Sequence, residues 1–162
     1  MKFDSNQGNP AWLKNPLLSW IQMLLNSYVH WTQTELIDRH GTPLEQAQHL
    51  FAAPFVVASH GGEAEPILNY GNAQALKLWE MNWEEFITTP SRLTAEPVNQ
   101  AERARMLQAT DRDGIIQNYR GARVSKAGNR FLVEKATVWN AVSYTHLRAH
   151  ETLRYLVCRL LL

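Results

Sequence analysis

Two β-rich segments, residues 115–125 and 129–140, limit the possible folds most, because only a short turn separates them. The turn, Lys126-Ala127-Gly128-Asn129, has the glycine and asparagine that favour a tight chain reversal. The two segments are therefore predicted to pair as an antiparallel hairpin. Along the second segment we expect Phe131, Val133 and Lys135 to face one way and Leu132, Glu134, Ala136 and Val138 to face the other.

A second hairpin is predicted earlier in the chain. Residues 55–59 and 67–70 are short apolar segments, and a glycine-rich heptapeptide lies between them. Helical segments follow, of which the first begins at Asn72 and the last covers residues 98–110 before Gly114. This order of elements predicts an α+β fold in which helices lie on one face of an antiparallel sheet.

The N-terminal part is predicted to be helical. Residues 1–9 are polar and expected to be disordered, whereas residues 16–36 carry apolar side chains at intervals of three and four, as on one face of an amphipathic helix. A second helix is expected to begin at Pro43, because Thr42 and Glu45 form a capping-box pattern. A homodimer could form through the aromatic face of the first helix, which comprises Trp20, Tyr28 and Trp31.

The segment from residue 142 to residue 162 differs from the rest of the chain. VSYTHLRAHET, at its start, resembles one translated frame of a transposase adapter used for sequencing libraries, and LVCRLLL, at its end, resembles the flow-cell sequence that follows a barcode. In that frame residue 155 has to be Tyr, His, Asn or Asp, and it is Tyr155. We therefore expect this tail to be non-native, and we assign no function to the histidine pair His146 and His150.

Composition excludes several classes of site from residues 1–141. The single cysteine, Cys158, lies in the tail, so disulfides, thiol nucleophiles and cysteine-ligated metals are excluded from the rest. The formal net charge of +1 gives no electrostatic reason to expect nucleic acid as a partner. The apolar runs are too short for a membrane span, and the N-terminus lacks the apolar core of a secretory signal. We expect a cytoplasmic protein that contacts neither nucleic acid nor membrane.

Several motifs within residues 10–140 resemble those of one family. An asparagine, here Asn72, opens the first helix after the initial hairpin of PAS domains, and the surrounding sequence ILNYGNAQALKLWEMNWEEF is similar to that stretch. The later PAS hairpin is similar to NYRGARVSKAGNRFLVEKATVWN. The chain resembles most closely a PAS-like branch, the MEKHLA domain. Patterns of that branch are similar, in the same order, to NYGN, LWE, PSRLTAEP, YRGARVS, GNRF and ATVWN. That family occurs as small bacterial proteins and in plant homeodomain–zipper regulators, so the resemblance implies a PAS fold and a sensory or regulatory role.

The resemblance also implies a domain organisation. Residues 1–15 would be a polar lead, residues 16–40 an N-terminal helix and residues 41–141 a PAS-like domain. A PAS sheet has a fifth strand in its centre, and this chain leaves the family pattern at Ala141, before that strand. We therefore expect a truncated domain, in which the tail either fills the central place by accident or lies elsewhere.

PAS domains hold ligands between helices and sheet, and the resemblance suggests candidates for the lining of such a pocket. Asn72 is interpreted either as a helix N-cap or as a polar group that faces the pocket. The aromatic candidates either line a cavity or pack in the core. Arg92 either pairs with Glu96, which would order the loop over the pocket, or binds an anion. The six candidates are Tyr70, Asn72, Trp79, Trp83, Phe86 and Arg92.

Known PAS cofactors have signatures that this sequence lacks. A photoactive flavin needs a cysteine near the pocket loop, and an oxygen-sensing haem would need a histidine near residues 98–113, but neither is present there. The histidines of residues 1–141 are scattered, and His60 is interpreted as the tip of a hairpin. Glu102, Arg103 and Arg105 are expected to face solvent. No nucleophile–base pair, phosphate-binding loop or metal-ligand spacing is found, so we expect no catalytic residue and no metal site.

The predicted function is a sensory or regulatory module that binds a small molecule between helices and sheet. The N-terminal helix would then transmit the signal or dimerise. A protein-interaction or dimerisation domain with a filled core is the alternative. An enzyme is the third, and only the predicted pocket supports it.

Overall fold

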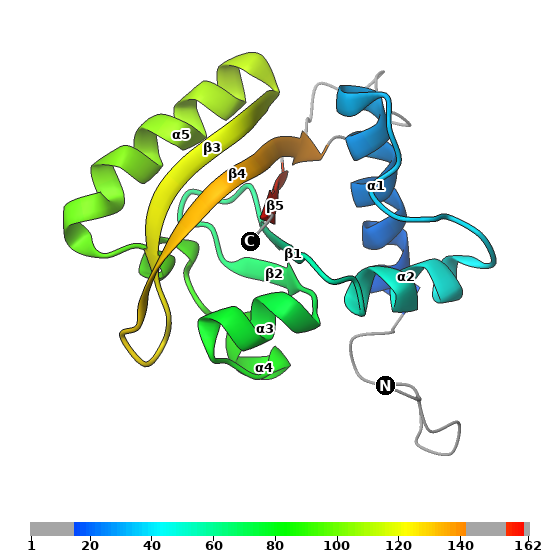
Figure 1. The fold of residues 1–162 in the computed structure, drawn as a ribbon, viewed down its shortest axis with the longest axis horizontal. Helices are drawn as coiled ribbons and strands as arrows, with labels where there is room; N and C mark the ends of the chain where they lie inside the picture. Colours follow the sequence, from blue (N-terminus) through cyan, green and yellow to red (C-terminus); the bar gives the residue numbers. More distant parts are fainter. Residues whose placement is uncertain (1–14, 142–154, 161–162) are drawn as a thin grey trace.

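The structure is a computed structural model that describes residues 15–141 and 155–160 (Figure 1). Five strands form one antiparallel sheet in the order β2-β1-β5-β4-β3. The strands are β1 (Val56–His60), β2 (Leu68–Gly71), β3 (Ile115–Val124), β4 (Arg130–Ala141) and β5 (Tyr155–Leu160). The helices are α1 (Asn15–Thr32), α2 (Pro43–Phe51), α3 (Ala73–Trp79), α4 (Trp83–Phe86) and α5 (Gln100–Asp113), with 3-10 turns η2 (Ser91–Thr94) and η3 (Pro97–Asn99).

Local sequence signals determine where several helices begin and end. The predicted capping box of α2 is confirmed, because Thr42 Oγ1 accepts a bond from Glu45 N at 3.3 Å and the Glu45 carboxylate accepts one from Thr42 N at 2.6 Å. A second capping box, between Asn82 and Glu85, starts α4. The predicted end of α5 is also confirmed, since Gly114 takes the left-handed conformation with φ 82°.

The side-chain pattern of β4 departs from the predicted alternation. Lys135 has φ 52°, and near it β4 has one residue more than β3 between paired positions. Such a bulge reverses the faces of the residues that follow it. Phe131 packs in the same core as Val133, as predicted, but Ala136 and Val138 lie in that core as well rather than on the opposite face.

Helices cover both faces of the sheet. On β1, Val56 belongs to the core beneath α3 and α5, whereas the next residue, Val57, belongs to the core beneath α1 and α2. On β4, Val138 and Trp139 divide in the same way. The prediction that helices lie on one face is therefore confirmed for α3 to α5, whereas α1 and α2 cover the opposite face (Figure 1). The reason is that the apolar face of α1 also has to be buried.

Strand β5 lies in the centre of the sheet. Val157 is paired with Ser59 of β1 on one side and with Trp139 of β4 on the other. β5 thus supplies hydrogen-bond partners to both halves of the sheet, which would otherwise have free inner edges. Of the two places considered for the tail, residues 155–160 occupy the central one. The non-native origin of the tail and the truncation of the domain stay predictions. The polar lead, the histidine pair and the remainder of the tail lie outside the described residues.

Candidate functional site

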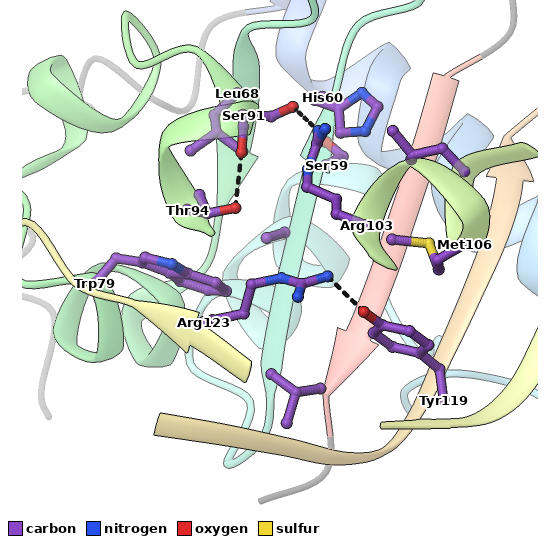
Figure 2. Close-up of a pocket in the computed structure, with 13 residues that line it drawn as sticks. Ser59, His60, Leu68, Trp79, Ser91, Thr94, Arg103, Met106, Tyr119 and Arg123 are labelled. Atoms are coloured by element: carbon purple, nitrogen blue, oxygen red, sulfur yellow. Dashed lines mark hydrogen bonds between the residues drawn. The ribbon is translucent and has the colours of Figure 1, made fainter. Parts of the chain in front are cut away.

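A cavity of about 70 Å³ lies between the sheet and helices α3 and α5 (Figure 2). Pockets for drug-sized ligands have roughly 300–1,000 Å³, so this cavity is too small for a flavin or a haem as it stands. It is large enough for a few water molecules or a ligand of a few heavy atoms. Much of its wall is apolar and consists of Ala58, Leu68, Met106, Leu107 and Val133.

Arg123, on β3, is buried at the cavity and well partnered. It is 7% exposed, and its Nη1 donates to Ala122 O at 2.8 Å while its Nη2 donates to Tyr119 Oη at 2.7 Å. Glu102 Oε2 lies 3.6 Å from Arg123 Nη1 and accepts a bond from Tyr119 Oη at 2.9 Å. Burial, together with the hydrogen bond to Glu102, raises the pKa of Tyr119 to about 12. This side of the cavity is therefore lined by a paired cation and a neutral phenol, and the carboxylate that partners both of them lies outside the lining.

Arg103, on α5, is equally buried but poorly partnered. It is 9% exposed, and its Nη2 donates to Ser91 Oγ of η2 (Figure 2). No carboxylate of the described residues lies within 4.0 Å of its guanidinium nitrogens. Burial lowers the pKa of Arg103, and the positive charge of Arg123 lowers it further. The expectation that Arg103 faces solvent is wrong, because Arg103 lies on the same face of α5 as Met106 and Thr110, which are both buried.

Two further polar groups at the cavity have no partner among the described residues. His60 Nδ1 lies 2.8 Å from Gly61 O, so Nδ1 carries the hydrogen and Nε2 is buried without a partner. Burial lowers the pKa of His60, which favours the neutral ring. Trp79 Nε1 is also buried without a partner, and the indole makes edge contacts with Phe86 and Phe131. His60 is therefore part of the cavity wall as well as the end of β1.

Asn72 confirms its predicted role as an N-cap and has a second role. Its Oδ1 accepts a bond from Ala75 N at 3.1 Å, which caps α3, and another from Val57 N at 3.0 Å. Its Nδ2 donates to Phe55 O and Leu50 O. These four bonds join α3 to β1 and to the end of α2, and Asn72 does not line the cavity.

The other candidates are divided between several places. Trp79 lines the cavity, whereas Tyr70 lies on the α1 side of the sheet with its ring 6.0 Å from that of Trp83. Phe86 packs in the core with the ring of Trp79. Arg92 is exposed and outside the cavity. Of the six candidates, the structure therefore brings only Trp79 to this cavity.

The predicted ion pair between Arg92 and Glu96 is wrong. Arg92 Nε lies 2.6 Å from Glu65 Oε1, in the loop between β1 and β2, and Glu96 Oε1 lies 2.7 Å from Arg130 Nε at the start of β4. Each partner lies far away in the sequence, so spacing within the loop could not reveal it. The two pairs tie η2 and its flanking residues to both hairpins.

Two of the residues expected in a dimer interface contact their own sheet. Tyr28 is 5% exposed and meets the ring of Trp139 edge-on at 5.0 Å. Trp31 Nε1 donates to Asn140 O at 2.9 Å. Trp20 is half-buried. Dimerisation stays a prediction. No described helix, α1 included, is both long and apolar enough to cross a bilayer.

The fold resembles that of several solved structures. An RNA-binding light-oxygen-voltage receptor matches with a TM-score of 0.60 and 14% identity, over 78% of this chain and 34% of the receptor chain. The blue-light photoreceptor Vivid matches with a TM-score of 0.51 and 16% identity, over 67% and 78% of the two chains. A PAS domain from Colwellia psychrerythraea matches with a TM-score of 0.56 and 13% identity, over 71% and 92%. At such identities the likeness shows the fold alone.

A family match is found at the level of sequence as well. A search of curated proteins finds no match to this chain. The MEKHLA domain matches residues 18–149, so the match extends past Ala141, where the chain was expected to leave the family pattern. The matched residues include every described residue that lines the cavity. The match covers most of the 162 residues. The chain therefore belongs to the MEKHLA domain family, and its structure is similar to that of PAS domains.

Proposed function

We propose that this protein is a sensory or regulatory module that binds a small molecule in the cavity between the sheet, α3 and α5. The observation that carries the proposal is the set of buried polar groups at the cavity that lack partners among the described residues. They are His60 Nε2 and Trp79 Nε1. Beside them lies the guanidinium of Arg103, a side chain that is 9% exposed and that donates to Ser91 Oγ. Buried polar groups without partners are costly, so an occupant that pairs with them would stabilise the folded state.

The contacts around Asn140 support a role for α1 in transmission. Asn140, near the end of β4, donates from Nδ2 to Thr110 O of α5 at 3.1 Å, and its carbonyl accepts from Trp31 Nε1 of α1 at 2.9 Å. α5 also carries Arg103 into the cavity. A shift of α5 on binding would therefore reach α1, on the opposite face of the sheet, through one residue.

Mass spectrometry can test the small-molecule function. The purified full-length chain would be denatured, and released compounds would be compared with those from Ala58→Val. Ala58 is 7% exposed and lines the cavity, so two added methyl groups would fill part of it while valine still suits a strand. We expect a compound that the wild type releases and the variant, shown by circular dichroism to be folded, does not. Equal release from both proteins, or release of nothing by either after exposure to a metabolite extract, would contradict the proposal.

A further inference from the structure

The polar groups at the cavity are mainly hydrogen-bond donors. A guanidinium has five N–H groups, and Arg103 uses one of them in its bond to Ser91 Oγ. The Trp79 indole is a donor only, and its Nε1 has no partner among the described residues. None of the described residues that line the cavity is an aspartate or a glutamate. An occupant that pairs with Arg103 and Trp79 therefore has to supply acceptors, whereas the unpartnered His60 Nε2 is itself an acceptor and calls for a donor.

The charge at the cavity is also unbalanced. Glu102 offsets the charge of Arg123, since its Oε2 lies 3.6 Å from Arg123 Nη1, and the same oxygen accepts a hydrogen bond from Tyr119 Oη. Arg103 has no such carboxylate among the described residues, although it is as buried as Arg123. A buried cation without a counter-ion is unfavourable, and a second cation nearby makes it more so. A single negative charge next to Arg103 would correct the imbalance.

Size and wall chemistry restrict the anion. A cavity of about 70 Å³ accepts few heavy atoms. The side chains of Leu68, Met106 and Val133 suit a short hydrocarbon chain rather than a second charge. A planar carboxylate matches the guanidinium fork through two parallel bonds, whereas a phosphate dianion would bring more charge than one unpaired arginine offsets.

We propose, on the basis of the function proposed above, that the cavity binds a small monocarboxylate whose carboxylate is held by Arg103. The apolar wall, together with the ring of Trp79 that also lines the cavity, covers the hydrocarbon end. Arg103 thus selects the charge of the ligand, and the volume of the cavity selects its length.

A titration followed by ¹H–¹⁵N NMR tests this assignment on the full-length chain. The additions are propionate, its neutral counterpart propionamide, and inorganic phosphate, and the signal followed is the Trp79 indole N–H, identified by its loss in Trp79→Phe. Propionate should shift this signal, and propionamide should bind at least about tenfold more weakly. Phosphate should leave the signal unchanged.

Three variants of α5 separate the role of Arg103 from a general effect of charge. Arg103→Met removes the buried guanidinium, and Arg105→Met removes an exposed one from the same helix. We expect Arg103→Met to weaken propionate binding about 100-fold and Arg105→Met by less than about twofold. Arg103→Lys keeps the charge without the fork, so it should bind with intermediate affinity, and it replaces the methionine variant if that fails to fold.

The outcomes distinguish this inference from the function on which it rests. Equal affinity for acid and amide, or unchanged binding in both Arg103 variants, would overturn the carboxylate assignment but leave a small-molecule site in place. Binding of phosphate in preference to propionate would also overturn it. If nothing shifts the Trp79 signal and the denatured protein releases no compound, both proposals fail.

Discussion

Loss of the Asn72 side chain should destabilise the fold more than loss of any ordinary helix cap. Asn72 is fully buried, and its amide accepts bonds from Val57 N and Ala75 N and donates to Phe55 O and Leu50 O. Asn72→Ala would leave two buried backbone N–H groups without acceptors. Each costs about 1–3 kcal/mol, so we expect the free energy of unfolding to fall by roughly 4 kcal/mol.

Asn82 provides a matched control for this variant. It caps α4 with nearly the same backbone angles, φ −79° and ψ 174° against φ −76° and ψ 177° for Asn72, and accepts a bond from Glu85 N at 2.9 Å. Asn82 is exposed, so water can replace that bond. We expect Asn82→Ala to cost about 1 kcal/mol, the usual value for a cap.

Urea unfolding followed by tryptophan fluorescence would measure both losses, provided that the dependence on urea is the same in each protein. A third variant, Asn72→Asp, keeps both acceptors but removes both donor bonds and buries a charge, so it should also destabilise strongly. Equal losses for Asn72→Ala and Asn82→Ala would refute the reasoning, because they would show that the links to β1 and α2 contribute nothing beyond the cap.

Three further predictions follow from backbone geometry and titration. Gly114 and Gly128 both have left-handed φ, but a Cβ at Gly114 would lie 2.2 Å from the ring of Trp31, whereas a Cβ at Gly128 would meet nothing within 4 Å. Gly128→Ala should therefore lose about 1 kcal/mol of stability from backbone strain alone, and thermal melting should show a larger loss of stability for Gly114→Ala. Lys135→Gly should raise the free energy of unfolding by up to about 1 kcal/mol, because φ 52° strains a lysine. An unchanged or lower midpoint of urea unfolding would contradict this. Burial lowers the pKa of His60 in the folded protein, so the unfolded chain binds the proton more readily. Stability should therefore fall as the pH decreases below about 6.5 and level off below the folded pKa. Thermal melting at a series of pH values should show this dependence in the wild type and not in His60→Asn.

Turn and capping chemistry made much of the fold predictable. The hairpin at Gly128, the capping box at Thr42 and the end of α5 at Gly114 rest on interactions within a few residues, which a sequence displays directly. The bulge at Lys135 could not be foreseen, because a lysine in the left-handed region has no sequence signal. That one residue decides which face Ala136 and later residues occupy.

The candidate site was harder to predict for a related reason. Leu68 and Tyr70 are two residues apart and would share a face in a regular strand, but an extra residue in β2 opposite Ser59 and His60 sends them to opposite faces. Leu68 therefore lines the cavity and Tyr70 packs under α1. An aromatic composition indicates a core but not the face on which each ring lies.

The burial of Arg103 departs most from what the sequence predicts. Charged residues on helices are almost never fully buried unless they are paired, which is why Arg103 was expected to face solvent. A methionine there would fill a similar volume without the cost of a buried charge, so Arg103→Met should make the empty protein more stable. A residue that lowers the stability of the empty fold gains its favourable partner only when an anion is present. The stability of the empty protein and its affinity for a carboxylate should therefore change in opposite directions in this variant, which a purely structural arginine would not produce.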